Sequence, residues 1–170
     1  EEGDLIFNPL DKNDLYSISK IMGESICIAS ENPRIHIVRL TNVTGNNFTS
    51  HLFLPSIIRD AITKNKIKVF TSLSSKKDYV YIDDVLEVIP KIAANGKNKI
   101  YNIASGKNIE SGKLINKISE ITGCDVEVSP ESKEYSFPET SINRIKEEFD
   151  FHPTNVLDKI EYIVEEFRKF

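Results

Sequence analysis

Tyr16 and Lys20 have the residue types and the spacing of an acid/base pair. They are four residues apart in a stretch with helical character, which places both side chains on one face about one turn apart. A lysine ammonium beside a phenol favours the phenolate and lowers a tyrosine pKa that starts near 10. Lowering that pKa to about 7 takes roughly 4 kcal/mol and makes the phenol a usable general acid or base. Taken alone, the pair fits a solvated helix face equally well.

The elements that must position this pair alternate between helical and extended patterns. After a loop over residues 1–13, a helix is expected over 14–30, with Asp14 as its N-cap and Asn32-Pro33 beyond its end. Residues 35–40 are β-branched and apolar enough for a strand buried on both faces, and residues 41–50 contain the turn-forming residues of a loop.

The rest of the chain continues the alternation, which is the pattern of an α/β protein. The elements expected after the loop are, in order, helix 54–64, strand 66–70, strand 78–82, a helix capped by Asp83 or Asp84 and reaching Ala94, strand 99–103, a helix capped by Ser111 and ended by Gly123, strand 125–128, helix 141–149 and helix 155–170.

Composition narrows the class of protein. A chain of 170 residues can form one domain with a real core or a lobe of something larger. The net charge of −4 argues against a nucleic-acid-binding or anionic-membrane surface, and no apolar run is long enough to span a bilayer. Cys27 and Cys124 lack metal-ligand spacing, which indicates free thiols in a reducing compartment, with the cytoplasm as the default.

Six short motifs follow one another along nearly the whole chain: Tyr16-Ser-Ile-Ser-Lys20, 38–45, 53–59, 77–85, 100–106 and 140–149. Each is weak alone, but their order and spacing resemble the second half of the extended short-chain dehydrogenase/reductases. More narrowly, they resemble the NAD-dependent nucleotide-sugar epimerases and dehydratases. The resemblance implies the C-terminal part of a Rossmann-type α/β fold with a small substrate-binding lobe. Residues 1–50 would be the last Rossmann elements and 51–170 mainly the lobe, with strand 99–103 returning to the Rossmann sheet.

The resemblance also implies roles for the helical pair. Tyr16 would act on a sugar hydroxyl or keto oxygen while hydride moves to or from NAD or NADP, and Lys20 would contact the nicotinamide ribose and lower the pKa of Tyr16. Both residues would therefore be catalytic and cofactor-binding. Such a reaction needs a proton acceptor within hydrogen-bond reach of the reacting oxygen as hydride leaves carbon.

Four further residues match substrate-binding positions of the family, whose substrate is a nucleotide-diphosphate sugar. Asn42 would hydrogen-bond the diphosphate, although an asparagine ahead of Gly45 also suits a turn. Lys77 stands where the family usually has an arginine that contacts the diphosphate, and the alternative is a surface lysine without a special role. Lysine supplies the positive charge but lacks the two parallel N–H donors of arginine. Tyr79 would line the sugar site or simply belong to the core. Lys133 lies near the family's second phosphate-binding arginine.

The dinucleotide-binding turn of the family is not in this sequence. No three of the seven glycines have the Gly-x-x-Gly-x-x-Gly spacing, the chain begins at Glu1, and its one methionine is Met22. These features lead us to expect a C-terminal fragment, inactive alone, whose NAD or NADP is bound mainly by a missing N-terminal half. An exposed sheet edge or the Tyr16 helix would then favour self-association or a homodimer. The alternative is a non-catalytic nucleotide-sugar-binding or interaction module that lacks a cofactor half.

Overall fold

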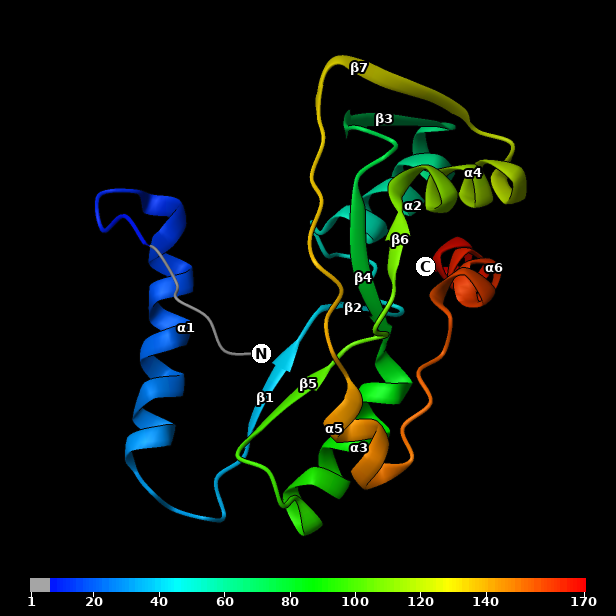
Figure 1. Ribbon diagram of the computed structural model, residues 1–170. Helices are drawn as coiled ribbons and strands as arrows, with labels where there is room; N and C mark the ends of the chain where they lie inside the picture. Colours follow the sequence, from blue (N-terminus) through cyan, green and yellow to red (C-terminus); the bar gives the residue numbers. More distant parts are fainter. Residues whose placement is uncertain (1–6) are drawn as a thin grey trace.

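The computed structural model describes residues 7–170, so the first part of the loop expected over 1–13 lies outside the described residues. Helices and strands alternate along the chain as expected for an α/β protein (Figure 1). The elements are α1 (Lys12–Ala29), β1 (Ile37–Leu40), β2 (Asn42–Thr44), α2 (Phe53–Lys64), β3 (Lys66–Thr71), β4 (Lys76–Tyr81), α3 (Ile82–Asn95), β5 (Ile100–Ile103), β6 (Asn108–Glu110), α4 (Ser111–Thr122), β7 (Asp125–Lys133), α5 (Asn143–Phe149) and α6 (Val156–Lys169).

The strands of the described residues form three small sheets. β1 pairs in parallel with β5, and β3 pairs in parallel with β7. The central sheet has the order β2-β4-β6, in which β2 and β4 are parallel while β4 and β6 are antiparallel. Because β1 leads directly into β2 and β5 into β6, the first and central sheets meet where β1 and β5 end.

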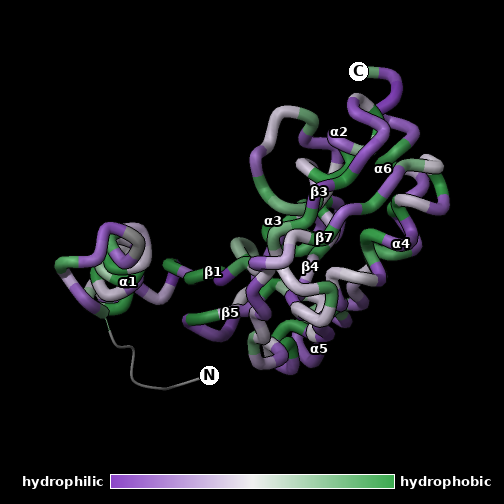
Figure 2. Tube along the Cα trace, turned by 90° about the horizontal axis from the view of Figure 1, so that it is seen from above, coloured by the Kyte–Doolittle hydropathy of each residue, from purple (hydrophilic) through white to green (hydrophobic). Residues whose placement is uncertain are grey.

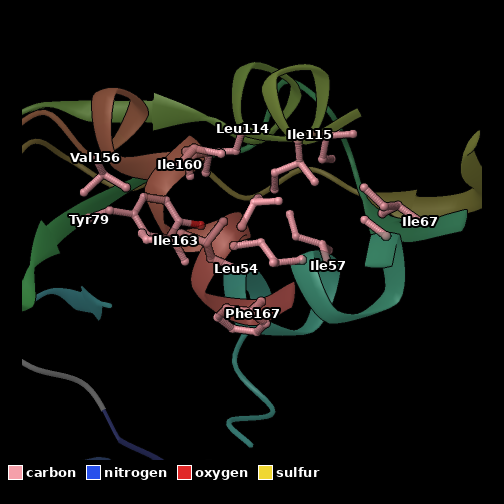
Figure 3. Packing of buried hydrophobic residues seen from close by; sticks show 14 of the residues in the cluster. Leu54, Ile57, Ile67, Tyr79, Leu114, Ile115, Val156, Ile160, Ile163 and Phe167 are labelled. Atoms are coloured by element: carbon pink, nitrogen blue, oxygen red, sulfur yellow. The ribbon is translucent and has the colours of Figure 1, made fainter. Parts of the chain in front are cut away.

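Two hydrophobic cores hold the body together. The larger lies among α2, α4 and α6 and the strands β3 and β4, and Figure 3 shows its side chains converging, with Ile163 and Ile160 of α6 against Tyr79, Leu54 and Leu114. The smaller core packs α3 and α5 on β5 through residues such as Val88, Ile145 and Tyr101. The apolar residues of α2 and α4 recur at helical spacing, and the face that they form on each helix lies in the larger core.

Helix α1 stands apart from this body in both the front view and the view from above (Figures 1 and 2). None of its described side chains is buried, and its exposed residues include several large apolar ones: Leu15, Tyr16, Met22, Ile26 and Ile28. Arg39 of β1 forms a salt bridge with Glu24 of α1, with Nε donating to Oε2 at 2.9 Å. The helix formed where it was predicted, but it packs on little of the described chain.

Two strands and one burial pattern differ from expectation. Residues 41–50 are not all loop, because β2 extends from Asn42 to Thr44 and pairs with β4; β6 was also missed. Strand 35–40 is not buried on both faces: it is half-buried as β1, and Leu40 is 47% exposed. Within the described residues β1 pairs with β5 alone, so one of its edges has no neighbour.

Three predicted helix caps were wrong. Asp14 lies inside the first turn of α1, where its Oδ2 accepts a hydrogen bond from the Asn8 N–H at 2.9 Å. Asp83 and Asp84 lie in the first turn of α3, and Ser111 is the first residue of α4. In each case the helix begins at or before the residue that was predicted to cap it. Asn155, by contrast, does cap α6 by accepting from Leu157 N–H.

In the part of the chain that the structure describes, no helix combines the length and apolar character that crossing a bilayer requires. Both cysteines are free; Cys27 is half-buried and Cys124 is buried.

Candidate functional site

Asp78 organises the point where the first and central sheets meet. Its side chain is only 4% exposed, and it accepts three hydrogen bonds at 2.8 Å, from the Thr41 hydroxyl and from the N–H groups of Ser105 and Gly106. A buried carboxylate is tolerated when donors surround it in this way. Asp78 thus fixes the segments that follow β1 and β5.

Gly106 is suited to its place in this arrangement. Its φ of 76° lies in the left-handed region, and a Cβ there would come within 3.0 Å of the Ile142 side chain. Glycine alone adopts this conformation without strain. The turn can therefore present its N–H to Asp78 while the chain passes close to Ile142.

A cleft of about 300 Å³ opens beside Asp78, and we call it the Lys77 cleft. Its size is at the lower end of small-molecule sites. Its lining residues come from the ends of β1 and β4, from β6 and from the segment between β7 and α5: Thr41, Asn42, Lys77, Asp78, Asn108, Phe137, Pro138 and Thr140. The structure therefore brings together Asn42 and Lys77, two of the residues singled out in the sequence.

Asn42 is held in a fixed orientation. Its Nδ2 donates to the backbone carbonyl of Asp78 at 2.8 Å, which leaves the second hydrogen of that amide group for another acceptor. The residue is the first of β2 and pairs with Tyr79 in the parallel register. Asn42 is therefore a strand residue tied to β4 rather than a turn-forming one.

Lys77 differs from its neighbour Lys76 in its electrostatic partners. Lys76 Nζ lies 3.3 Å from a carboxylate oxygen of Glu110. Lys77 is half-buried, and its Nζ lies 6.0 Å from the centroid of the Phe137 ring, with no carboxylate partner among residues 7–170. A cation held against an aromatic face and not neutralised by a carboxylate can bind an anionic ligand.

Asn108 is a residue of the cleft that the sequence did not single out. Its Nδ2 donates to the Phe137 carbonyl at 2.6 Å, while its Oδ1 is buried without a hydrogen-bond partner among the described residues. A buried acceptor without a partner is unfavourable unless a ligand or water donates to it. No sequence signal marks this residue, because its role depends on the pairing of β6 with β4.

Two other predicted substrate contacts lie elsewhere. Tyr79 is 3% exposed and belongs to the larger core rather than to the cleft lining. Its hydroxyl has no hydrogen-bond partner among the described residues, and burial raises its pKa. Lys133 is the exposed last residue of β7 and is not part of the cleft lining.

Tyr16 and Lys20 lie close together on α1, as their spacing predicts. Lys20 Nζ is 5.1 Å from the centroid of the Tyr16 ring, and the tyrosine is 70% exposed. No residue of α1 lines the Lys77 cleft. The acid/base pair and the cleft therefore form two separate parts of the described chain.

The described residues contain no cluster of three or more histidine, cysteine or acidic side chains that could hold a metal ion. The side chains that line the cleft include a cation, two amides, two hydroxyls, an aromatic ring and the hydrogen-bonded carboxylate of Asp78. This set suits a ligand with both anionic and hydroxyl groups.

Comparison with known proteins gives relatives of known activity. The chain is 32% identical over 114 residues to the dTDP-4-dehydro-6-deoxyglucose reductase of Escherichia coli, an alignment that covers 61% of this chain and 35% of the relative. Three solved structures share the fold. The NADPH complex of RMD from Pseudomonas aeruginosa has a TM-score of 0.80 at 19% identity, covering 100% of this chain and 60% of that one.

The NAD complex of dTDP-glucose 4,6-dehydratase from Bacillus anthracis has a TM-score of 0.77 at 19% identity, covering 99% of this chain and 58% of that one. ADP-L-glycero-D-manno-heptose-6-epimerase of Helicobacter pylori has a TM-score of 0.78 at 18% identity, covering 98% of this chain and 56% of that one. This chain thus spans about a third of the curated relative and less than two thirds of each solved structure.

A family model described as the NAD dependent epimerase/dehydratase family matches residues 1–104. The match includes α1, β1, β2 and β4, and it covers five of the six predicted site residues: Tyr16, Lys20, Asn42, Lys77 and Tyr79. A match over more than half of the sequence, together with the shared fold, establishes that the chain belongs to the NAD-dependent epimerase/dehydratase family.

Proposed function

We propose that this chain is the nucleotide-sugar-binding part of an NAD(P)-dependent epimerase, dehydratase or reductase. The observation that carries the proposal is the ammonium of Lys77, which has no carboxylate partner in the described residues and shares a cleft with the tethered amide of Asn42. A diphosphate supplies the anion that such a cation and amide would bind. A sugar supplies hydroxyl groups, from which Asn108 Oδ1 would accept a hydrogen bond.

The relatives support this substrate class. The names of similar proteins include a dTDP-sugar reductase and a dTDP-glucose dehydratase, and one protein of the same fold was solved in complex with UDP-glucose and NAD. We extend the class, a nucleoside diphosphate linked to a sugar, to this chain. Lysine in place of a bidentate arginine would hold the diphosphate by charge with less directional hydrogen bonding.

The proposed acid/base is Tyr16, with Lys20 as its partner. Both groups are adjacent and accessible on α1, so they fit the nicotinamide end of a dinucleotide, where Lys20 would reach a ribose hydroxyl. When bound, the nicotinamide would accept or return a hydride. Tyr16 would remove or return the proton on the sugar oxygen, and the Lys20 ammonium would stabilise the phenolate.

The free apolar surface of α1 supports a further part of the proposal. Leu15, Met22 and Ile26 are exposed, and among residues 7–170 β1 pairs with β5 alone, so one edge of β1 has no neighbouring strand there. A dinucleotide-binding half would pack on this helix and add strands to this sheet. In the intact enzyme, α1 would also form part of a homodimer interface. We propose a cytoplasmic enzyme of this kind, in which the 170 residues alone are inactive.

One observation favours a second function, a nucleotide-sugar-binding module without catalysis. The Lys77 cleft is built without any residue of α1, so ligand binding does not depend on the acid/base pair. In that case the sugar nucleotide would bind with the same affinity whether or not Tyr16 is intact, and no turnover would accompany binding.

The test is a calorimetric titration of the 170-residue chain with dTDP-glucose, UDP-glucose and a GDP-sugar. We expect at least one to bind saturably, and Lys77→Ala to weaken it about tenfold or more, because a charge-assisted contact is worth roughly 1.5–3 kcal/mol. Lys76→Ala is the matched control, since Lys76 pairs with Glu110, and it should bind normally. Equal losses in both variants, or no binding by the unmodified chain, would refute the proposed site.

A further inference from the structure

A second cleft, of about 410 Å³, lies among the β5–β6 connection, β6, the start of α4, α5 and the segment that leads into α6. Three lysines from three different segments line it: Lys107, Lys113 and Lys146, and His152 joins them. We call it the lysine cleft. It shares only Asn108 with the Lys77 cleft and shares no cationic residue with it.

The three lysines of this cleft are not neutralised within the described residues. None of Lys107, Lys113 and Lys146 has a carboxylate oxygen within 4.0 Å among residues 7–170, and the cleft lining includes no aspartate or glutamate. Other lysines of the body do have such partners: Lys64, Lys66, Lys68, Lys76, Lys91 and Lys169. Positive charge therefore gathers in one hollow of a chain whose net charge is −4.

Two carboxylates contact residues of the cleft lining but do not line the cleft themselves. Asp84 accepts hydrogen bonds from the N–H and the hydroxyl of Thr154 at 2.8 Å, which anchors the segment before α6, and Asp150 lies 3.0 Å from His152 Nε2 on the surface. The neighbouring groove between α4 and α6 shares Lys113 with the lysine cleft, and its lining also includes Lys117, Glu120, Asp158 and Glu161. Of these two grooves, the lysine cleft is the one without a carboxylate in its lining.

We propose that the lysine cleft binds a small soluble phosphate compound carrying at least two phosphoryl groups, at a site separate from the nucleotide-sugar cleft. Three ammonium groups match the charge of a diphosphate or a polyphosphate, and lysine binds phosphate as a point charge without demanding a fixed geometry. The volume exceeds that of a single phosphate and lies within the range of small-molecule sites. Ser105 and Asn155 add polar groups to the wall.

The test uses inorganic pyrophosphate as the probe, titrated calorimetrically into the 170-residue chain at low salt. We expect saturable binding of one pyrophosphate per chain that weakens as salt is raised. The triple variant Lys107→Gln, Lys113→Gln and Lys146→Gln should bind pyrophosphate about tenfold or more weakly, because it loses the three charges that would contact the phosphoryl oxygens. Circular dichroism of this variant, whose changes are all on exposed side chains, checks that it folds.

A matched triple variant, Lys64→Gln, Lys91→Gln and Lys97→Gln, changes the net charge equally at exposed positions outside the cleft, and it should bind pyrophosphate within about twofold of the unmodified chain. Equal losses in the two triple variants would overturn the proposal in favour of a diffuse charge effect. Absence of saturable binding would overturn it outright. Binding of the chain to anionic phospholipid vesicles through the three lysines, without pyrophosphate binding, would replace it with a membrane surface.

Lys77→Ala separates this site from the proposed nucleotide-sugar site. We expect that variant to keep its pyrophosphate affinity, and the lysine-cleft triple variant to keep its dTDP-glucose affinity. Loss of pyrophosphate binding in Lys77→Ala would show that the probe enters the Lys77 cleft, which contradicts the second site while leaving the proposed function intact.

Discussion

The body of the molecule and helix α1 bury their apolar residues to very different extents. In the body, α2, α4 and α6 enclose side chains such as Ile58 and Ile163 that have no exposed surface. In α1, apolar residues of similar size, such as Ile26, are more than half exposed. The body therefore carries the packing that stabilises it, whereas α1 keeps an apolar face that a partner surface would cover.

The two candidate functional features, the Lys77 cleft and the Tyr16–Lys20 pair, also lie in different regions, the body and α1. The Lys77 cleft is assembled by Asp78, whose hydrogen bonds tie strand ends to one another inside the body. The Tyr16–Lys20 pair depends on helical spacing alone and has no support from the body. The Lys77 cleft is thus assembled within this chain, while Tyr16 and Lys20 lie on a helix that contributes no residue to the cleft lining.

The largest expected effect contrasts one isoleucine from each region. Ile163→Ala removes packing in the larger core and should lower the free energy of unfolding by about 2–5 kcal/mol. Ile26→Ala on α1 should change it by less than about 0.5 kcal/mol, because that side chain is already in solvent. Urea denaturation of the 170-residue chain measures both. A large loss in Ile26→Ala would mean that α1 is packed on the body in solution.

The second prediction concerns Tyr16 in the intact enzyme that we propose. Tyr16→Phe should lower turnover about a hundredfold or more, the low end for loss of a general acid/base, while leaving nucleotide-sugar affinity unchanged. Steady-state kinetics with a calorimetric affinity for the same variant measures the two effects separately. Tyr162→Phe, an exposed tyrosine on α6, is the control. Unchanged turnover in Tyr16→Phe would remove the catalytic assignment.

The third prediction tests whether Asp78 builds the cleft. Asp78→Asn places an amide where Oδ1 and Oδ2 now accept from Thr41, Ser105 and Gly106, so at least one buried donor loses its acceptor. We expect a loss of about 1–3 kcal/mol in the free energy of unfolding, together with weaker dTDP-glucose binding. Asp83→Asn, at an exposed position of α3, should change stability by less than about 0.5 kcal/mol. Equal losses of stability in Asp78→Asn and Asp83→Asn would argue against the role of the Asp78 hydrogen bonds in building the cleft.

The smallest expected effect is a pH dependence of the link between α1 and β1. The hydrogen bond donated by Arg39 holds the pKa of Glu24 below its ordinary value, against the opposing effect of partial burial, and the Arg39 charge adds to the lowering. Because the folded pKa is depressed, the link is complete above the unfolded pKa of about 4.3 and is lost as pH falls through the folded value.

A ¹³C NMR titration of the Glu24 carboxyl measures this link. The midpoint should lie below the ordinary glutamate value in the unmodified chain and should return to it in Arg39→Gln. An unchanged midpoint in that variant would show that Arg39 does not hold α1 in solution.

Most of the fold could be predicted from the sequence because local patterns report burial. The periodic apolar residues of 54–64 and 111–122 defined two core helices within a residue or two, and Gly123 and Asn155 marked real helix ends. β2 and β6 could not be predicted, since each has three residues and is stabilised by its pairing with β4 rather than by its own composition.

The candidate site was predictable in part. The motif order indicated Asn42 and Lys77, which the structure brings into one cleft, and the four-residue spacing placed Lys20 beside Tyr16. Asn108 and the role of Asp78 depend on contacts between segments about thirty residues apart, and no local pattern carries that information. Tyr79 matched a substrate-binding position of the family, with a core residue as the alternative, and the structure places it in the larger core.

The most direct test of the account is a map of backbone amide shifts in the ¹⁵N NMR spectrum as dTDP-glucose, or whichever nucleotide-sugar binds, is added to the 170-residue chain. We predict that the shifts concentrate at residues 41–42, 77–78 and 137–140, around the Lys77 cleft, while the amides of α4 and α6 stay unchanged. Shifts confined to the lysine cleft, or to α1, would contradict the claim that the Lys77 cleft binds the nucleotide-sugar.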